Sequence, residues 1–282
     1  METDGRAMLR RRVGVLLRRS REAADLAIED VAAHLECSSA KVRRIENGQV
    51  AVRPLEIREI LALYEVPDAR RSALLDLARR SRESKLEWWQ EYADVVGPDY
   101  EFFVGLEDRA TLICDYQSYL IPGLLQTESY MRAVMDAYRV PADEAALRIR
   151  FRQKRQSLLV DAGSPAFRAV IEENALRKKV GDDSVMREQL RRIVDVGSRS
   201  RVSIQIIPAA TGLHPAEGRA FIMLGFPDPE EPKVVYLEHL NGSHLLDTPA
   251  KTVAFDRAFA DLQAIALSPD DSASLIEDMV KE

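Results

Sequence analysis

Hydrophobic positions between residues 27 and 48 recur at helical spacing in two short blocks. The stripe positions are Val31, Ala32 and Leu35 in the first block and Val42 and Ile45 in the second. The residues between the blocks, Glu-Cys-Ser-Ser at positions 36–39, include serine hydroxyls that suit the start of a helix. This pattern predicts two short helices joined by a tight turn, a helix-turn-helix motif.

The same periodicity predicts three more helices around this motif. One covers residues 7–24, and Pro54 and Pro67 suit the first turns of two others. Their apolar stripes are Leu9, Val13, Leu16 and Leu17, then Leu55, Ile57, Ile60, Leu61 and Leu63, then Leu74, Leu75, Leu77 and Ala78. We expect a five-helix domain over residues 1–80, with its last helix continuing as a connector to about Tyr92.

Aromatic residues crowd the connector and linker that we assign to residues 81–98, together with the residues just after it. They are Trp88, Trp89, Tyr92, Tyr100, Phe102 and Phe103. Such a cluster forms a ligand pocket, a dimer surface, or the seam where a connector packs on a second domain. We favour the seam, because large rings most often serve ordinary packing.

Beyond Asp99 the chain is expected to form a second domain, over residues 99–282. A Pro-Gly turn at 122–123 precedes an apolar helical stripe, and further along the periodicity changes from 3.6 to 2. Predicted helices follow that turn and cover 141–160, 183–198, 250–266 and 269–280, and predicted strands cover 167–172, 202–207, 220–226 and 234–239. Residues 106–116 fit either a helix or a strand. We therefore predict an α+β domain with a small sheet of about four strands.

The outward face of the second helix of the motif is basic and polar. Its side chains suit a major groove, where Arg and Lys bind guanine, Ala contacts a thymine methyl and Ser bonds to several bases. The candidate base contacts are Ser39, Ala40, Lys41, Arg43 and Arg44. The candidate phosphate contacts are Ser38, Asn47 and Gln49. The alternative is an ordinary amphipathic helix with a solvated charged face.

Charge is divided unevenly along the 282 residues. The net charge is −6, yet residues 5–80 hold 16 basic and 11 acidic side chains, which leaves +5 there and −11 in the remainder. This segregation is expected if one domain meets phosphates and the other does not. The two cysteines lack metal or redox spacing, and the apolar runs are too short for a membrane helix. We expect a cytoplasmic protein with free thiols.

The motif resembles the helix-turn-helix of the lambda-repressor-like, xenobiotic-response-element family of regulators. The matching positions are Val31, Ala32, Leu35, Ser38, Val42, Ile45, Glu46, Asn47 and Gly48. Two positions depart from the family: Ile28 replaces a phosphate-contacting Gln, and Glu36 replaces a Gly with positive φ. The resemblance also implies a partly buried ion pair between Arg21 and Glu46 that orients the recognition helix.

The second part of the chain resembles a domain of unknown function that follows this motif in a large actinobacterial regulator family, to which WhiJ-like regulators belong. The matching segments are Gly-Leu-Glu at 105–107, Pro-Gly-Leu-Leu-Gln-Thr at 122–127, Glu-Glu-Asn-Ala-Leu at 172–176, His-Pro at 214–215 and Val-Tyr-Leu-Glu-His at 235–239. The resemblance implies DNA as a partner and, often, a very small acidic protein encoded nearby.

The sequence offers little for catalysis. His239 and His244 flank a turn rather than sharing a helix face, so the HExxH zinc pattern is absent, as are a nucleophile elbow and a glycine-rich phosphate loop. We predict no catalytic residue, no metal site and no cofactor. Polar residues near the predicted strand ends are a possible ligand pocket, with Tyr116, Tyr119, Glu173, His214, Tyr236 and His239 as its candidates. Hydrogen-bonded polar residues that close a sheet are the favoured alternative.

These patterns together predict a DNA-binding transcriptional regulator whose C-terminal domain senses a ligand or a protein partner. One recognition helix covers only a few base pairs, so we expect a homodimer on a palindromic site in double-stranded DNA. Two other functions stay open. The protein is alternatively a toxin–antitoxin-like component that mainly sequesters the small acidic protein, or an enzyme tethered to DNA.

Overall fold

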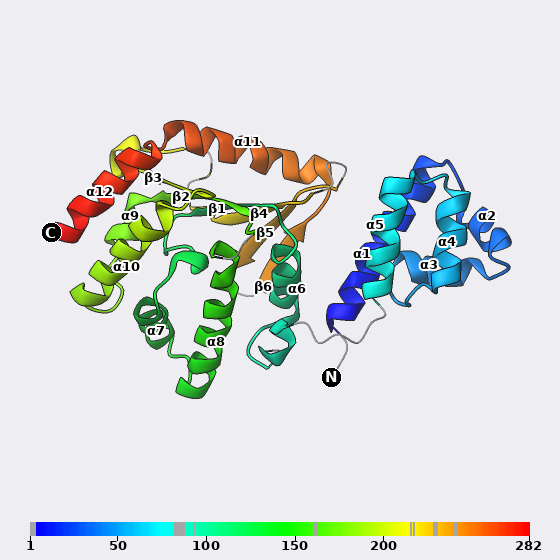
Figure 1. The fold of residues 1–282 in the computed structure, drawn as a ribbon, viewed down its shortest axis with the longest axis horizontal. Helices are drawn as coiled ribbons and strands as arrows, with labels where there is room; N and C mark the ends of the chain where they lie inside the picture. The colour runs from blue at the N-terminus through cyan, green and yellow to red at the C-terminus, as the bar shows by residue number, and fades with distance from the viewer. Residues whose placement is uncertain are drawn as a thin grey trace. The chain divides into compact units, whose positions relative to one another are not determined.

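The chain forms two compact units, Met1–Glu91 and Tyr92–Glu282. The computed structural model describes residues 4–81, 88–92, 94–160, 163–214, 216, 218–227, 231–239 and 242–282. Figure 1 traces the chain through both units, each of which has a hydrophobic core of its own.

The N-terminal unit is a bundle of α-helices (Figure 1). Its helices are α1 (Asp4–Ala23), α2 (Ile28–His34), α3 (Ser39–Glu46), α4 (Pro54–Leu63) and α5 (Asp68–Arg80). The apolar stripes meet in one core that includes Val13, Leu17, Val31, Val42, Ile45, Ile57, Ile60, Leu61, Leu74 and Leu77. The predicted helical domain with five helices is therefore confirmed, with each helix within about three residues of its expected start.

The connector differs from the predicted continuous helix. Helix α5 ends at Arg80, where the Ser81 hydroxyl donates to the Ala78 carbonyl at 2.7 Å and satisfies one of the last free carbonyls of the helix. The expected course through 82–87 lies outside the described residues. Trp88–Tyr92 is a short 3-10 helix rather than the end of a long α-helix.

The C-terminal unit is built on a mixed sheet. Its strands are β1 (Leu112–Gln117), β2 (Ala166–Glu172), β3 (Val202–Ile207), β4 (Phe221–Gly225), β5 (Val234–His239) and β6 (Gly242–Leu246). They lie in the order β3-β2-β1-β4-β5-β6. The first three are parallel to one another, and the pairs β1–β4, β4–β5 and β5–β6 are antiparallel.

The α+β class is confirmed, but the expected sheet of about four strands was too small, because the described residues hold six. Strand β1 lies at the centre of the sheet and is buried on both faces, so its sequence shows no alternation. Strand β6 is a short and partly exposed edge strand. It begins with glycine, serine and histidine, a composition that is more typical of a turn than of a strand. These are the two strands that the periodicity did not resolve.

Helices cover both faces of this sheet (Figure 1). One face packs against α11 (Pro249–Ile265), whose Phe259 and Leu262 join a core with Tyr116 and Phe221. The opposite side carries α6 (Pro98–Glu107), α8 (Ala142–Arg155) and α10 (Asp183–Gly197). The remaining helices are α7 (Glu128–Ala137), α9 (Glu173–Arg177) and α12 (Pro269–Lys281), and short 3-10 turns cover Gly123–Leu125, Gln156–Leu159 and Ala209–Thr211.

The segment 122–127 makes hydrogen bonds that connect three helices. Thr127 begins α7, where its hydroxyl accepts from the Tyr130 amide at 3.2 Å. The Thr127 amide in turn donates to the Gln189 side chain of α10 at 2.7 Å. Gln156, just after α8, donates to the Gln126 carbonyl at 2.7 Å. The segment is mostly buried and holds three helices in place.

Candidate nucleic-acid interface and C-terminal cavities

Helix α3 presents two different faces. It begins after Ser38, whose hydroxyl accepts from the Lys41 amide at 3.3 Å. Val42, Ile45 and Glu46 are buried in the bundle. The side chains between them in sequence therefore point away from the core, because successive helical residues turn by about 100°.

The residues predicted to contact DNA lie on this outward face or at the ends of α3. The exposed ones are Ser38, Ala40, Arg43, Arg44, Asn47 and Gln49. Ser39 and Lys41 are half-buried. All eight positions lie in α3 or at its two ends, and each is at least partly accessible.

The three cations of this face differ in their protein partners. Lys41 Nζ pairs with Glu56 Oε1 of α4 at 2.5 Å. Arg43 has a longer contact, 3.6 Å, with Glu29 of α2, and both side chains are more than half exposed. Arg44 makes no ion pair with any residue that the structure describes. Arg44 is thus the cation that can bind an external anion with the least rearrangement.

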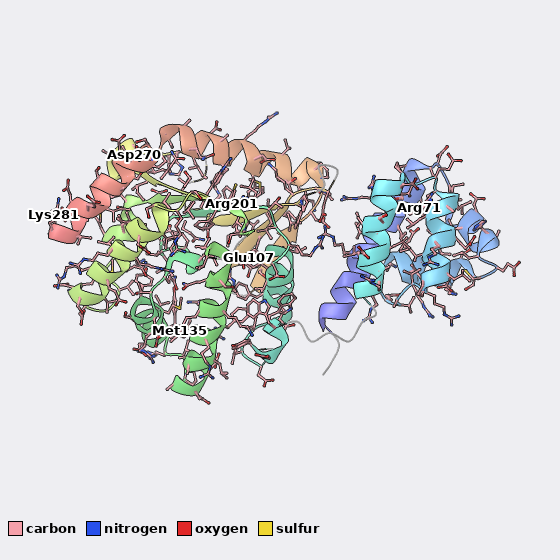
Figure 2. The ribbon with its side chains drawn as sticks, in the orientation of Figure 1. Arg71, Glu107, Met135, Arg201, Asp270 and Lys281 are labelled. Carbon is pink, nitrogen blue, oxygen red and sulfur yellow. The ribbon has the colours of Figure 1, made fainter. Side chains whose placement is uncertain are left out.

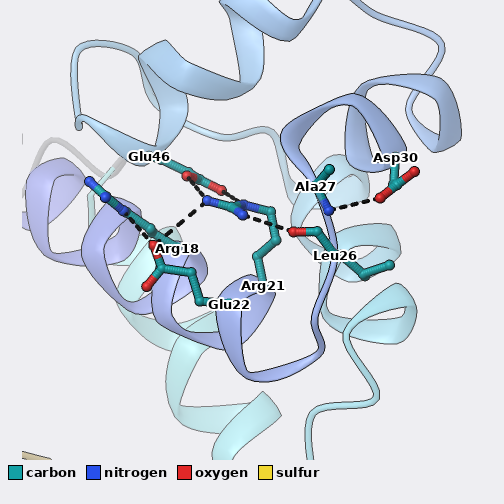
Figure 3. A network of polar contacts seen from close by, with 7 residues as sticks. All are labelled: Arg18, Arg21, Glu22, Leu26, Ala27, Asp30 and Glu46. Carbon is teal, nitrogen blue, oxygen red and sulfur yellow. Dashed lines mark hydrogen bonds and ion pairs between the residues drawn. The ribbon is translucent and has the colours of Figure 1, made fainter.

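A buried ion pair holds the carboxyl end of α3 (Figure 3). Arg21 Nε donates to Glu46 Oε1 at 2.8 Å, and Arg21 Nη2 donates to Glu46 Oε2 at 3.1 Å. The same guanidinium donates to the Leu26 carbonyl at 2.8 Å, so it joins α1, the turn before α2, and α3. Nearby, Tyr64 is buried, and this burial raises the pKa of its phenol, which stays neutral. The residues expected from the family pattern to pair do lie together.

Gly14 lies where α1 comes closest to α3, and sequence reasoning missed it. A Cβ placed on Gly14 would lie 2.4 Å from the Glu46 carbonyl oxygen and 2.5 Å from that of Ile45. Only a residue without a side chain permits this approach. The sequence did contain a sign of this contact. Glycine is unfavourable in the middle of a helix, so its presence there indicates a close packing contact.

The turn between α2 and α3 contains the second departure from the family pattern. Glu36 has φ 49°, the left-handed conformation that glycine adopts at this place in the family. The protein thus keeps the backbone of the turn although the residue is not glycine, at a cost of roughly 1 kcal/mol.

The candidate ligand residues of the second domain divide between two places. At the first, the Tyr116 hydroxyl donates to Glu172 Oε1 at 2.6 Å, and His214 Nε2 lies 2.8 Å from the same oxygen. All three side chains are buried. Tyr119 lies beside them in a cavity of about 270 Å³ that Ser118 and Lys178 also line, with Lys178 Nζ 5.5 Å from the Tyr119 ring.

Glu173 faces elsewhere: it pairs with Arg177 at 2.6 Å and accepts from the Ala209 amide at 2.9 Å. Tyr236 and His239 line a second cavity, of about 480 Å³, at the end of β5. Strands β2 and β5 are three strand spacings apart, roughly 14 Å. The six candidates therefore share one edge of the sheet but do not share a cavity.

A second buried arginine–glutamate pair lies between α6 and α8, with Glu107 labelled in Figure 2. Arg155 Nε donates to Glu107 Oε2 at 2.8 Å, and Arg155 Nη2 donates to Glu107 Oε1 at 2.7 Å. Arg155 also donates to the Tyr100 hydroxyl. Beside the pair, burial raises the pKa of Asp115 on β1 to about 7. Sequence reasoning missed this group, because its members come from three elements that are far apart in the chain.

Comparison with known families gives one match within each of the two compact units. A helix-turn-helix domain model matches residues 12–74, and the model of a domain of unknown function (DUF5753) matches residues 100–278. The chain belongs to the DUF5753 family. No curated protein and no solved structure gave a significant match. The helix-turn-helix match supports a DNA-binding regulator in which the DUF5753 domain follows the DNA-binding part.

The DUF5753 domain and the part before it show no metal centre within the described residues: no three His, Cys, Asp or Glu side chains gather there. Both cysteines are free, Cys37 half-buried and Cys114 buried. In the described part of the chain, no helix has the length and apolar character needed to cross a membrane.

Proposed function

We propose that the chain is a cytoplasmic, sequence-specific DNA-binding transcriptional regulator whose DUF5753 domain senses a ligand or a small protein partner. The observation that carries this proposal is the outward face of α3. Its inward side is fixed by the core and by the Arg21–Glu46 pair, while its outward side exposes Arg43 and Arg44. A rigid helix with an unneutralised arginine on its free face suits readout of a major groove.

The ion pairs of α3 rank the proposed DNA contacts by how easily each side chain becomes free to bind. We assign base contacts to Ser39, Ala40, Lys41, Arg43 and Arg44, and phosphate contacts to Ser38, Asn47 and Gln49. Arg44 comes first, because it has no ion pair to break. Lys41 contributes only if DNA replaces its Glu56 partner, and Arg43 gives up a long, exposed contact with Glu29.

Within helix-turn-helix regulators, we assign the first domain to the lambda-repressor-like, xenobiotic-response-element group and the whole chain to the WhiJ-like regulators. The Arg21–Glu46 geometry and the left-handed Glu36 support the first assignment. We divide the chain into a DNA-binding domain (1–80), a connector (81–98) and a sensing domain (99–282). The change from one compact unit to the next falls inside this connector and supports the division.

The proposed partners are a palindromic operator, a second copy of the chain and a small acidic protein. One short recognition helix contacts few base pairs, so a homodimer supplies the second half-site. The net charge of +5 over residues 5–80 attracts an acidic protein as well as DNA, so the two partners are expected to compete.

We also propose that the DUF5753 domain acts by binding rather than by catalysis. The Glu172 carboxylate is buried and already engaged by Tyr116 and His214. His239 and Glu173, which a joint polar site would have to include, lie apart from it. This arrangement supports closure of the sheet by satisfied polar groups.

The test measures binding of the full chain to its own upstream DNA and to scrambled DNA by fluorescence anisotropy over a salt series. Arg44→Ala is expected to weaken operator binding by about 1–3 kcal/mol and to relax specificity at one base pair. Asn47→Ala is expected to weaken binding to all sequences equally. The matched control is Arg191→Ala, which removes an exposed arginine from α10. Operator affinity that is the same in Arg44→Ala and wild type would overturn the recognition-helix assignment.

A further inference from the structure

The larger of the two C-terminal cavities has an aromatic wall. It encloses about 480 Å³ between α6, α8 and the β5–β6 hairpin, a size typical of small-molecule sites. Tyr100, Phe151 and Tyr236 line it, with the Tyr100 ring centroid 5.9 Å from each of the other two. Tyr100 is half-buried and Phe151 and Tyr236 are almost fully buried, so the three rings present a small apolar surface to a planar molecule.

Two arginines one helical turn apart on α8 complete the lining. Arg148 pairs with Glu144 at 2.6 Å, although its buried Nε atom has no hydrogen-bond partner in the described residues. Arg152 donates from Nη1 to the neutral Gln126 side chain at 3.2 Å. No carboxylate within the described ranges forms an ion pair with Arg152.

Arg152 therefore has no direct ion pair within the described residues. Arg152 is half-buried, and this burial lowers its pKa, although the Glu238 carboxylate in the same cavity is near enough to offset part of this effect by raising the pKa. The next arginine on the helix, Arg155, shows the contrast, since Glu107 neutralises it through two hydrogen bonds. Glu238 also lines the cavity, but its side chain is exposed at the rim. An anionic group on a ligand would supply a direct ion-pair partner.

We propose that this cavity binds a planar aromatic carboxylate, with its ring against Tyr100, Phe151 and Tyr236 and its carboxylate on the Arg152 guanidinium. A guanidinium fork bonds a carboxylate through two parallel N–H groups, so it selects the acid over a neutral analogue. Residues 95–97 form another part of the wall, and they follow the point where the chain passes from the first unit to the second. The bound acid therefore contacts the segment that leads from the DNA-binding unit. This effect on DNA rests on the proposed function, whereas binding of the acid does not.

The test is calorimetric titration of the full chain with 2-naphthoate and with its neutral isostere, 2-naphthamide. Wild type is expected to bind the acid at least about ten-fold more tightly than the amide, because the bond to the guanidinium is charge-assisted. Arg152→Gln is expected to bind both probes equally, and Arg152→Lys to recover part of the preference. Arg150→Gln, which changes an exposed arginine on the same helix, is the matched control and keeps the wild-type preference.

Three results overturn the proposal: no binding of 2-naphthoate at millimolar concentration, equal affinity of wild type for the two probes, or an unchanged preference in Arg152→Gln. Circular dichroism verifies that each variant is folded. Operator titrations with and without 2-naphthoate then separate the two proposals. If the chain binds the acid but no DNA, the ligand proposal stands and the proposed DNA-binding function is wrong. If it binds the operator but not the acid, the proposed function stands and the ligand proposal is wrong.

Discussion

Within the residues that the structure describes, each unit contains one buried arginine–glutamate pair with two hydrogen bonds, but the two pairs connect different elements. Arg21–Glu46 joins α1 to the end of a helix whose other face is free, and its side chains are 10% and 4% exposed. Arg155–Glu107 joins two helices beneath a cavity, and its side chains are 4% and 1% exposed. The first pair fixes a helix whose opposite face is exposed, whereas the second joins two helices that line a cavity.

The largest expected effect comes from breaking the more deeply buried pair. Glu107→Ala leaves the Arg155 charge buried without a counterion and is expected to cost about 4 kcal/mol of unfolding free energy. Hydrogen exchange of α6 and α8 peptides in a guanidinium series measures this loss within the C-terminal unit. The control Glu128→Ala removes an exposed pair with Arg132 and should cost at most about 0.5 kcal/mol. Equal losses in the two variants would contradict the prediction.

Breaking the N-terminal pair is expected to cost less, about 3 kcal/mol for Glu46→Ala, because Arg21 retains its bond to the Leu26 carbonyl and some contact with water. Hydrogen exchange of α1 and α3 peptides measures it, with Glu22→Ala as the exposed control.

A double variant sharpens the comparison between orientation and stability. Arg21→Met combined with Glu46→Leu replaces both charges by apolar groups and is expected to regain most of the lost stability. Operator specificity should not return, if the pair fixes the direction of α3. Full recovery of specificity would show that the pair is needed for stability alone.

Gly14→Ala is expected to destabilise the N-terminal unit by about 2 kcal/mol. The added methyl group meets backbone carbonyls at 2.4–2.5 Å, and this overpacking outweighs the gain in helix propensity. Gly197→Ala in α10 is the control, because its new Cβ lies 3.5 Å from a flexible Ile204 side chain. Chemical denaturation measures both variants; a stabilised Gly14→Ala protein would show that α1 can move away from α3.

Two kinds of information explain what the sequence could and could not predict. Helix positions and most strands follow from periodicity, which is local, so α1 to α5, α10, α11 and α12 were expected close to where they lie. The Arg21–Glu46 pair could be predicted from the sequence because a family pattern links those two positions. No pattern links Glu107, Arg155 and Asp115, and only the folded sheet brings them together.

The cavities show the same limit. Residues at the ends of strands were expected to meet, but the order of the strands decides which of them do so. Because β1 and β4 lie between β2 and β5, Glu172 and His239 reach separate cavities. Arg152 lies on a helix whose position was predicted from periodicity, but its environment could not be predicted from helical spacing.

Asp115 is expected to make the stability of the C-terminal unit depend on pH. Burial raises the pKa of this carboxyl to about 7, so between pH 4 and 7 the folded state holds a proton that the unfolded state has released. Stability contributed by this group is therefore present at low pH and is lost as pH rises through about 7. Asp115→Asn removes this dependence.

Relative to wild type, the variant is expected to gain about 3 kcal/mol of unfolding free energy between pH 5 and pH 8, because pH 5 lies about two units below the folded pKa and each unit is worth about 1.4 kcal/mol. Guanidinium denaturation at each pH measures this gain. Asp261→Asn, on the exposed surface of α11, should show no such trend. A constant difference between Asp115→Asn and wild type across this range would contradict the assignment.

The separation of the two faces of α3 has a consequence for how such a protein can change over generations. Val42, Ile45 and Glu46 are committed to the bundle, while Ala40 and Arg44 are exposed and contribute little to its stability. Under the proposed base contacts, substitutions at the exposed positions are therefore expected to alter the preferred DNA sequence without unfolding the domain. Duplicated copies of the gene could acquire new operators in single steps, and the same positions are the natural choice for laboratory retargeting.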